Sequence, residues 1–224
     1  MDLSLASEFR EFPKIARLSR EMVVTEKIDG TNAQIFIEAG THVTHPHAIA
    51  HWFDEATQTD LVMCAGSRTR WVTPADDNYG FARWATEHAS ELWGLGLGRH
   101  FGEWWGSGIQ RGYGLPKGEK RFSLFNVSRW CLHGEIPKQV TTADPRVVKT
   151  QDVLPCCVDL VPVLADGIFD LQAVNDALFR LQYHGSYAAP GFMNPEGVVV
   201  YHAAAGICFK KTLKNDETPK SKVA

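Results

Sequence analysis

Residues 22–38 read MVVTEKIDGTNAQIFIE, two runs rich in β-branched residues on either side of Asp29 and Gly30. An Asp-Gly pair supplies the positive φ angles of a tight turn, so this stretch predicts a β-hairpin with its turn at these two residues. Lys27 ends the first run, and such a turn would expose its side chain. Similar strand-like runs recur along the chain, so the expected fold is rich in β-strands.

The other strand-like runs are rich in β-branched or aromatic residues and are bounded by turn-forming residues, at 61–67, 100–105, 121–127, 153–164, 196–202 and 206–211. Apolar residues recur at helical spacing in two places, from Phe81 to Leu92 and from Leu171 to Leu181. Many strands with few helices, in no regular alternation, predict an α+β domain built on antiparallel sheets. Because no repeat or low-complexity tract interrupts the chain, we expect one domain over residues 1–214 and a flexible polar tail over 215–224.

The composition narrows the class of protein. No apolar run approaches the roughly 18 residues that a membrane helix needs, and the polar start MDLSLASEFREF lacks an export pattern, so we expect a cytoplasmic protein with no membrane partner. A net charge of -3 does not favour general coating of nucleic acid. Basic residues do gather at 10–20, 68–70, 117–121 and 210–214, where they are typical either of solvated surface or of a phosphate-binding face.

The cysteines and histidines match no recognised metal-binding spacing. Five cysteines include no CxxC pair, and we expect reduced, mostly buried thiols, with Cys156 and Cys157 packed in a strand. The segment THVTHPHAIAH contains His42, His45, His47 and His51, and imidazole binds zinc well. No cysteine or acid completes a ligand set there, so a polar surface loop is favoured over a structural metal.

Lys27, Ile28, Asp29 and Gly30 form a KxDG motif. Four residues with one wildcard occur by chance in many proteins, and a lysine beside a turn usually faces solvent. A lysine that acts as a nucleophile must be uncharged, which requires desolvation or cationic neighbours. The rest of the sequence should therefore supply further cations and a pocket for a ligand.

The segment FPKIARLSREMVVTEKIDGTNAQI, residues 12–35, closely resembles the opening of the ATP-dependent RNA ligase family. This family is one of the covalent nucleotidyltransferases, together with DNA ligases and mRNA-capping guanylyltransferases. Five later segments are similar to motifs Ia, III, IIIa, IV and V of that superfamily, in the same order: GSRTRW (66–71), FGEWWG (101–106), RFSLFNV (121–127), PEGVVV (195–200) and FKKT (209–212). The string TEKIDGTN resembles the nick-sealing branch of phage RNA ligases. If the protein is encoded by a phage, it would act in the cytoplasm of the host cell.

The resemblance implies a nucleotidyltransferase (adenylation) domain of two antiparallel β-sheets flanked by helices, with the active site between the sheets. It implies ATP and Mg²⁺ or Mn²⁺ as cofactors, and nucleic acid with 5′-phosphate and 3′-hydroxyl ends, most often RNA, as the substrate. AMP would pass from ATP to Lys27, then to the 5′-phosphate, and would leave when the 3′-hydroxyl attacks. Such transfers require positioning and charge neutralisation.

Relatives usually carry an OB-fold or helical domain after the last motif, whereas only residues 213–224 follow it here. We therefore expect no such domain in this chain. A ligase that borrows a nucleic-acid clamp from a partner protein is one interpretation. A minimal ligase and a protein limited to AMP transfer are alternatives. DNA ligase, GTP-dependent capping enzyme and non-catalytic RNA-binding relative are the other functions that stay open.

Residue roles follow from the same resemblance. Lys27 would form the bond to AMP, with Glu26 near the adenine and Phe125 stacked on it. Arg68, with Arg70 as the alternative, would contact the ribose and phosphates. Each side chain also has an ordinary structural interpretation. The lysine and arginines could lie on the surface, the glutamate on a strand edge and the phenylalanine in the core.

Glu103 would accept a hydrogen bond from a ribose hydroxyl. An acid between bulky aromatic residues is costly to bury without a partner, which favours this role over an ordinary strand position. Ile28 and Asp29 would shape the nucleotide site, and Thr31 and Asn32 would lie near the phosphates. Turn formation and turn capping would explain the last three as well.

Glu196 would bind the metal ion, because carboxylates and water are the ligands that Mg²⁺ prefers. Lys210 would act in catalysis by neutralising the α-phosphate. Two positions depart from the family pattern: Asn126 stands where an acid is common, and Lys210-Lys211-Thr212 replaces lysine, any residue, lysine. Either Lys211 substitutes for the second lysine or that cation is missing.

Overall fold

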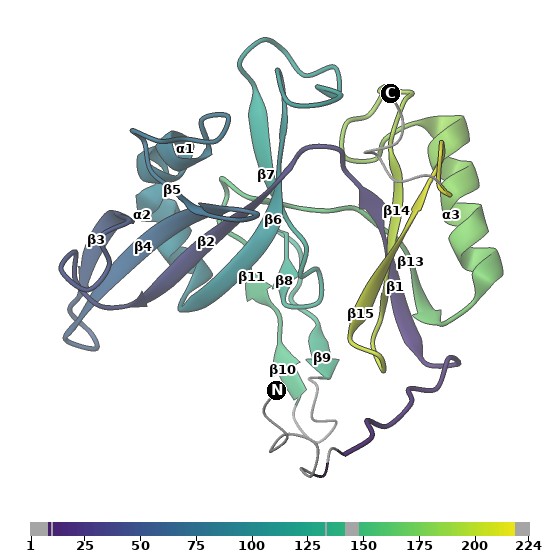
Figure 1. Cartoon of the computed structure of the whole chain (residues 1–224), viewed down its shortest axis with the longest axis horizontal. Coiled ribbons are helices and arrows are strands. Elements are labelled where there is room, and N and C mark those ends of the chain that lie inside the picture. Colours follow the sequence, from purple (N-terminus) through teal and green to yellow (C-terminus); the bar gives the residue numbers. More distant parts are fainter. Residues whose placement is uncertain (1–8, 10, 133, 142–147, 218–224) are drawn as a thin grey trace, which may run out of the picture.

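The computed structural model describes residue 9 and residues 11–132, 134–141 and 148–217. Its elements form two groups that lie side by side, and the chain passes from one group to the other between β1 and β2 (Figure 1). The expected α+β class is confirmed, since helices are few and strands predominate. The described residues form four sheets, where two were expected: a four-stranded sheet, a seven-stranded sheet and two small two-stranded sheets.

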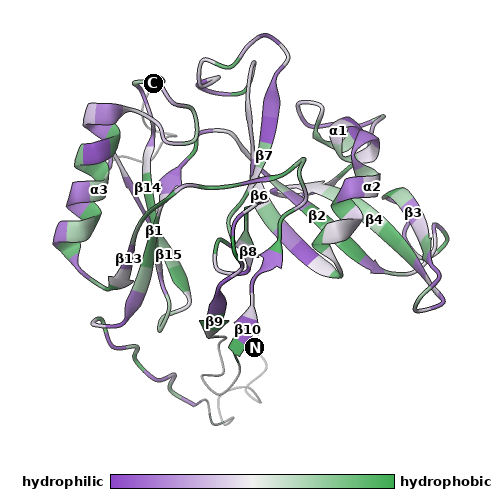
Figure 2. Cartoon of the chain, turned by 180° about the vertical axis from the view of Figure 1, so that it is seen from behind, coloured by the Kyte–Doolittle hydropathy of each residue, from purple (hydrophilic) through white to green (hydrophobic). Residues whose placement is uncertain are grey.

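The four-stranded sheet has the order β13-β1-β14-β15, and all its pairs are antiparallel. Its strands are β1 (Glu21–Lys27), β13 (Val163–Ile168), β14 (Gly197–His202) and β15 (Ile207–Thr212). One face packs on helix α3 (Leu171–His184) through a core that includes Val24, Leu178 and Val198. α3 confirms the predicted helix, and apolar and polar stretches alternate along it (Figure 2).

The ends of α3 follow from its sequence. Asp170 caps the first turn, because its carboxylate accepts a hydrogen bond from the Gln172 amide. Gly185, with φ 82°, follows the last helical residue. Among the described residues, no helix is long and apolar enough to cross a membrane.

The seven-stranded sheet has the order β12-β7-β6-β2-β4-β3, with β5 paired to β4. Its strands are β2 (Thr31–Ala39), β3 (Ala48–Asp54), β4 (Thr59–Ser67), β5 (Trp71–Val72), β6 (Gly98–Gly106), β7 (Lys120–Leu124) and β12 (Asp159–Leu160). β12 runs parallel to β7, which departs from the antiparallel prediction. The small sheets pair β9 (Gln139–Thr141) with β10 (Val148–Thr150) and β8 (Trp130–Cys131) in parallel with β11 (Asp152–Val153).

The helix predicted over residues 81–92 is interrupted. It forms α1 (Phe81–Glu87) and α2 (Ala89–Leu92), followed by the 3-10 helix η2 (Trp93–Leu95). His88 leaves the helical region at φ −103°, and its ring Nδ1 lies 2.9 Å from the Trp84 carbonyl oxygen. These helices supply apolar side chains to a core on one face of the seven-stranded sheet, beside Ile35, Trp104 and Phe122.

The predicted hairpin at Asp29-Gly30 is wrong. β1 already has β13 and β14 as neighbours, and β2 has β4 and β6, so the two strands belong to different sheets. Gly30 is also absent from the residues with positive φ in the described part of the chain. It is needed for a close approach, because a Cβ there would lie 2.5 Å from the Trp104 carbonyl oxygen and 2.7 Å from Trp105 Cβ.

The strand predicted over residues 153–164 is broken into β11, β12 and the start of β13. Pro155 and Pro162 lie between these pieces and cannot donate to a sheet. Cys156 and Cys157 therefore lie in a turn, which corrects their predicted strand packing. All five thiols are free, but Cys156 and Cys208 are exposed, so the expectation of mostly buried thiols is wrong.

Candidate functional site

Lys27 lies at the end of β1, where it pairs with Gly197 at the start of β14. Its Nζ is 2.6 Å from Oε2 of Glu196. The side chain of Lys27 is 23% exposed, whereas that of Glu196 is 2% exposed. A buried carboxylate requires a close cation, so this pair fixes the amine at a place that solvent can reach.

Arg111 and Tyr113 hold the segment that follows Lys27. Arg111 Nε donates to Asp29 Oδ2 at 2.9 Å, and its Nη1 donates to the carbonyl oxygens of Asn194 and Pro195 at 2.8 and 2.9 Å. The Tyr113 hydroxyl accepts the Asp29 amide at 2.8 Å. Arg111 therefore ties the residue two after Lys27 to the residues just before Glu196. Neither Arg111 nor Tyr113 was predicted, and the glycine-rich stretch around them was the only local signal.

Glu103 lies on β6 opposite Asn32 on β2. Its carboxylate accepts hydrogen bonds from the Gly30 amide at 3.0 Å and from Asn32 Nδ2 at 3.2 Å. Burial raises the pKa of Glu103 to about 7; the Gly30 amide and the charge of Lys27 lower it, and the charges of Glu196 and Asp29 raise it. Glu103 is thus electrostatically coupled to the residues around the Lys27 amine.

Glu26 points to the other face of β1, because neighbouring side chains alternate along a strand. Its carboxylate accepts hydrogen bonds from Ser186 Oγ at 2.6 Å and from the amides of Tyr187 and Ala188 at 2.8 and 3.0 Å. Burial raises the pKa of the Glu26 carboxyl above its ordinary value, and the three hydrogen bonds lower it. Glu26 therefore organises the loop after α3, and its contact with adenine stays a prediction.

Strand register separates the two lysines of β15. Thr25, Val199 and Lys210 are aligned across β1, β14 and β15. Directly opposed residues share a face, so Lys210 lies on the same face of the sheet as Lys27. Lys211 lies on the α3 face, where its Nζ donates to Asn175 Oδ1 at 3.1 Å. The next residue of β15 on the Lys27 face is Thr212, two positions after Lys210.

The remaining predicted residues have no direct bond to the Lys27 amine. Within the described chain, no hydrogen bond or ion pair joins Lys27 to Arg68, Phe125 or Lys210. Phe125 directly follows β7 and is 42% exposed. Its amide donates to the carbonyl oxygen of Phe101 on β6. Arg68 is exposed just beyond β4, whereas its alternative Arg70 is paired with Asp76 at 2.7 Å.

Two other predicted residues have structural contacts. Ile28 is buried against Trp105 and Tyr113. Thr31 Oγ1 accepts a hydrogen bond from Asn78 Nδ2 at 3.3 Å. These contacts support the interpretation that both residues shape the crossover between the sheets. A role of either residue in binding the nucleotide stays a prediction.

The carboxylates fit a divalent cation only in part. Asp29, Glu103 and Glu196 offer the oxygen ligands that Mg²⁺ prefers. However, within the described residues no three His, Cys, Asp or Glu side chains converge on a metal position. An ion that is held by one or two carboxylates and completed by phosphate oxygens and water, as Mg²⁺ commonly is, needs no such cluster.

The histidines form separate pairs. His45 Nε2 is 2.5 Å from Glu38 Oε1, and His51 Nε2 is 2.9 Å from Asp60 Oδ1. The rings of His42 and His51 are 5.8 Å apart. His51 lies on β3, and the three other histidines lie in the exposed loop before it.

A cavity of about 500 Å³ lies between the two larger sheets. It is lined by Ser123 on β7, Asp159 on β12 and Val163 on β13, and by Tyr187 and Ala188, whose amides bind Glu26. Burial raises the pKa of Asp159 above its ordinary value, and Arg121 lowers it. None of the predicted site residues lines this cavity, which adjoins the site only through the Tyr187 and Ala188 loop that binds Glu26.

Comparison with known proteins gives one family and a group of solved structures. The family described as RNA ligase matches residues 20–214. Two alanine variants of a Naegleria gruberi RNA ligase, each solved with ATP and Mn, are 16% identical to this chain, with TM-scores of 0.47 and 0.49. They cover 87% and 88% of this chain, which spans 50% and 51% of theirs, about half their length. No curated protein matches the sequence.

Proposed function

The chain belongs to the RNA ligase family, and on this premise we propose that it is an ATP-dependent RNA ligase that carries AMP on Lys27. The observation that supports this most strongly is the 2.6 Å pair between Lys27 Nζ and Glu196 Oε2. It gives one partly exposed amine a fixed direction at the junction of the two larger sheets. We assign the active site to this junction, where β1 crosses to β2.

In the proposed first step, Lys27 passes its proton to Oε2 of Glu196, 2.6 Å away, and the neutral amine attacks the α-phosphorus of ATP. The carboxylate favours the charged amine, unlike the cationic neighbours expected from the sequence, so the proton must leave before the attack. A P–N bond forms, the bond to the bridging oxygen breaks, and pyrophosphate leaves with the electron pair. Oε2 of Glu196 orients the amine, and Arg111 keeps the segments on either side in register through Asp29. A bound divalent cation would offset phosphate charge during this step.

In the second step AMP moves from Lys27 to the 5′-phosphate of RNA, which restores the free amine. In the third step the 3′-hydroxyl of RNA attacks that phosphate, forms the phosphodiester bond and releases AMP. Lys210, on the Lys27 face of the four-stranded sheet, would neutralise charge on the transferred phosphate. Phe125 and Glu103 would hold the base and ribose.

The first test is covalent labelling. The protein is incubated with Mg²⁺ and either ATP or GTP labelled on the α-phosphate, then denatured and separated by electrophoresis. We expect label from ATP on the wild type and none on Lys27→Ala or Lys27→Arg. Lys27→Arg keeps a cation beside Glu196, so it separates loss of the nucleophile from loss of the ion pair. Lys117→Ala, at an exposed position, is the matched control and should label normally.

The outcomes separate the functions. Label from GTP alone would identify a capping enzyme, and no label from either nucleotide would indicate a non-catalytic relative. Both results would refute the proposal. Joining assays with nicked duplex, single-stranded and tRNA-like RNA, and with the DNA equivalents, then test the later steps. A protein that labels but joins none of them would be limited to AMP transfer.

A further inference from the structure

One face of the seven-stranded sheet continues from Glu103 away from the reaction centre. β2 and β6 are paired so that Asn32 faces Glu103, Gln34 faces Phe101 and Phe36 faces Arg99. Because these residues alternate with buried core positions such as Ile35, their side chains share the face opposite the core. Phe101 is 52% exposed, so this face is open to solvent.

Arg99 is held in place on this face without an acidic partner. Its Cζ lies 4.1 Å from the ring centroid of Phe36 and 5.3 Å from that of Trp71. Its Nη1 donates to Gln34 Oε1 at 3.1 Å, and the described residues accept none of its other N–H groups. The nearby carboxylate of Glu38 is paired with His45 instead. A planar guanidinium that is fixed by rings and an amide retains free donors for an anion.

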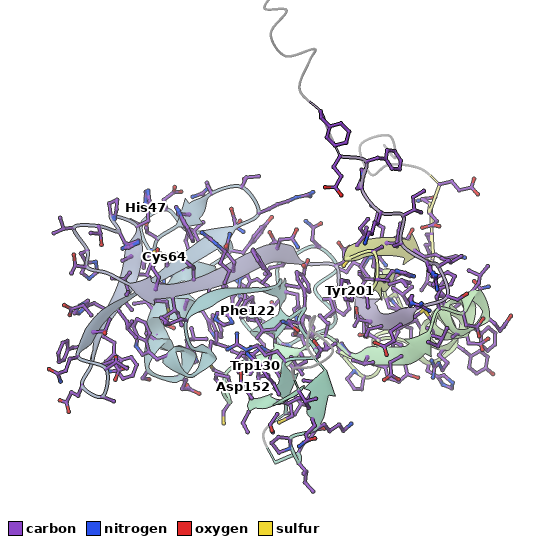
Figure 3. All side chains as sticks on the ribbon, turned by 90° about the horizontal axis from the view of Figure 1, so that it is seen from below. His47, Cys64, Phe122, Trp130, Asp152 and Tyr201 are labelled. Carbon is purple, nitrogen blue, oxygen red and sulfur yellow. The ribbon has the colours of Figure 1, made fainter. Side chains whose placement is uncertain are left out.

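A hollow of about 240 Å³ lies beside this guanidinium. Its lining includes Phe36, Trp71, His47 and Cys64 together with Arg99, and also Glu38, whose carboxylate is paired with His45. Figure 3 shows His47 and Cys64 in the same part of the molecule, on the left of the view and well separated from Tyr201 on β14. Sites for single nucleic-acid strands combine cationic side chains with aromatic rings, and this face has both beside an open hollow.

We propose that Arg99 binds a backbone phosphate of the RNA strand and that the hollow receives an adjoining nucleotide. This inference rests on the proposed ligase function. Four residues separate Arg99 from Glu103 along β6, which is about 13 Å at the rise of a strand. At the rise of about 3.4 Å per nucleotide of a stacked strand, this distance corresponds to about four nucleotides counted from the position of Glu103. A stacked RNA of about three nucleotides would fall short of Arg99.

The test measures RNA binding by fluorescence anisotropy, with 5′-phosphorylated RNA of about three and about twelve nucleotides. The variants are Arg99→Gln, which removes the charge, and Arg99→Lys, which keeps the charge but loses the planar fork. Arg83→Gln is the matched control, because Arg83 is an exposed arginine on α1, on the other side of the same sheet. Thermal unfolding of each variant verifies that the fold is kept.

We expect Arg99→Gln to weaken binding of the longer RNA about fivefold and to lower the slope of log affinity against log salt by about 0.7. Arg99→Lys should retain the slope with a smaller loss of affinity. Binding of the short RNA should not change in any variant. Equal behaviour of Arg99→Gln and Arg83→Gln, or an equal loss for both RNA lengths, would overturn the inference.

Self-adenylation separates this inference from the proposed function. Because Arg99 is distant from Lys27, all three variants should label from ATP as the wild type does. Normal labelling with unchanged RNA binding would refute the Arg99 site alone. Absence of labelling in the wild type would refute the ligase function, whatever the RNA result.

Discussion

Replacing Glu103 by glutamine should change stability in a way that depends on pH. Glu103 is 8% exposed, and burial raises its pKa from 4.5 to about 7. The folded state therefore binds the proton more tightly than the unfolded state. Its contribution to stability is complete below pH 4.5 and is lost as the pH rises through about 7.

The shift sets the size of the effect. A change of 2.5 pKa units, taken at 1.36 kcal/mol per unit, corresponds to about 3 kcal/mol as an upper bound. Glutamine cannot ionise, so it avoids this loss. It can accept only one of the two hydrogen bonds that Gly30 and Asn32 donate, which costs about 1 kcal/mol at every pH. Relative to the wild type, Glu103→Gln should therefore gain roughly 1–3 kcal/mol between pH 4.5 and pH 8.

Urea unfolding at about pH 4.5 and pH 8 measures this difference, with the slope of free energy against urea concentration as a check on two-state behaviour. Glu87→Gln, which removes an exposed carboxylate on α1, is the matched control. A difference between Glu103→Gln and wild type that is the same at both pH values would refute the reasoning. So would a relative gain at the lower pH.

Three further changes test the site. Gly30→Ala should destabilise the fold by about 1–3 kcal/mol in thermal unfolding, because its Cβ would collide with main-chain oxygen on β6; normal stability would contradict the close approach. Arg111→Ala removes the ion pair with Asp29, so it should slow adenylation at least tenfold and lower the free energy of unfolding by about 1–2 kcal/mol. Arg111→Lys should restore part of the rate, and equal rates for both variants would exclude a positioning role. Lys210→Ala should slow adenylation strongly and Lys211→Ala little, as measured by label per minute, and the reverse order would contradict the register argument.

The sequence predicted those elements whose signals are local. α3 has an apolar stripe, an aspartate cap and a following glycine, so its position was readable. The turn at Asp29-Gly30 was misread because the dipeptide favours a hairpin, whereas the partners of β1 and β2 come from distant segments. The close contact with β6 that requires Gly30 leaves no trace in the neighbouring sequence.

The motifs pointed to Lys27, Glu103 and Glu196 because each lies in a recognisable segment. The structure places these three side chains near one another, and their roles stay predictions. Arg111 was missed because its partner Asp29 is 82 residues away, and a contact of that range has no periodic signature. Whether Lys211 could replace the second lysine of the last motif likewise depended on the strand register, which the sequence does not contain.

The most direct measurement is the mass of the peptides released from the protein after incubation with ATP and Mg²⁺. We expect a single adduct of one AMP, carried by the peptide that contains Lys27 and lost on acid treatment as a P–N bond would be. An adduct on another residue, or RNA joining by a protein whose Lys27 is replaced, would contradict the covalent role of this amine.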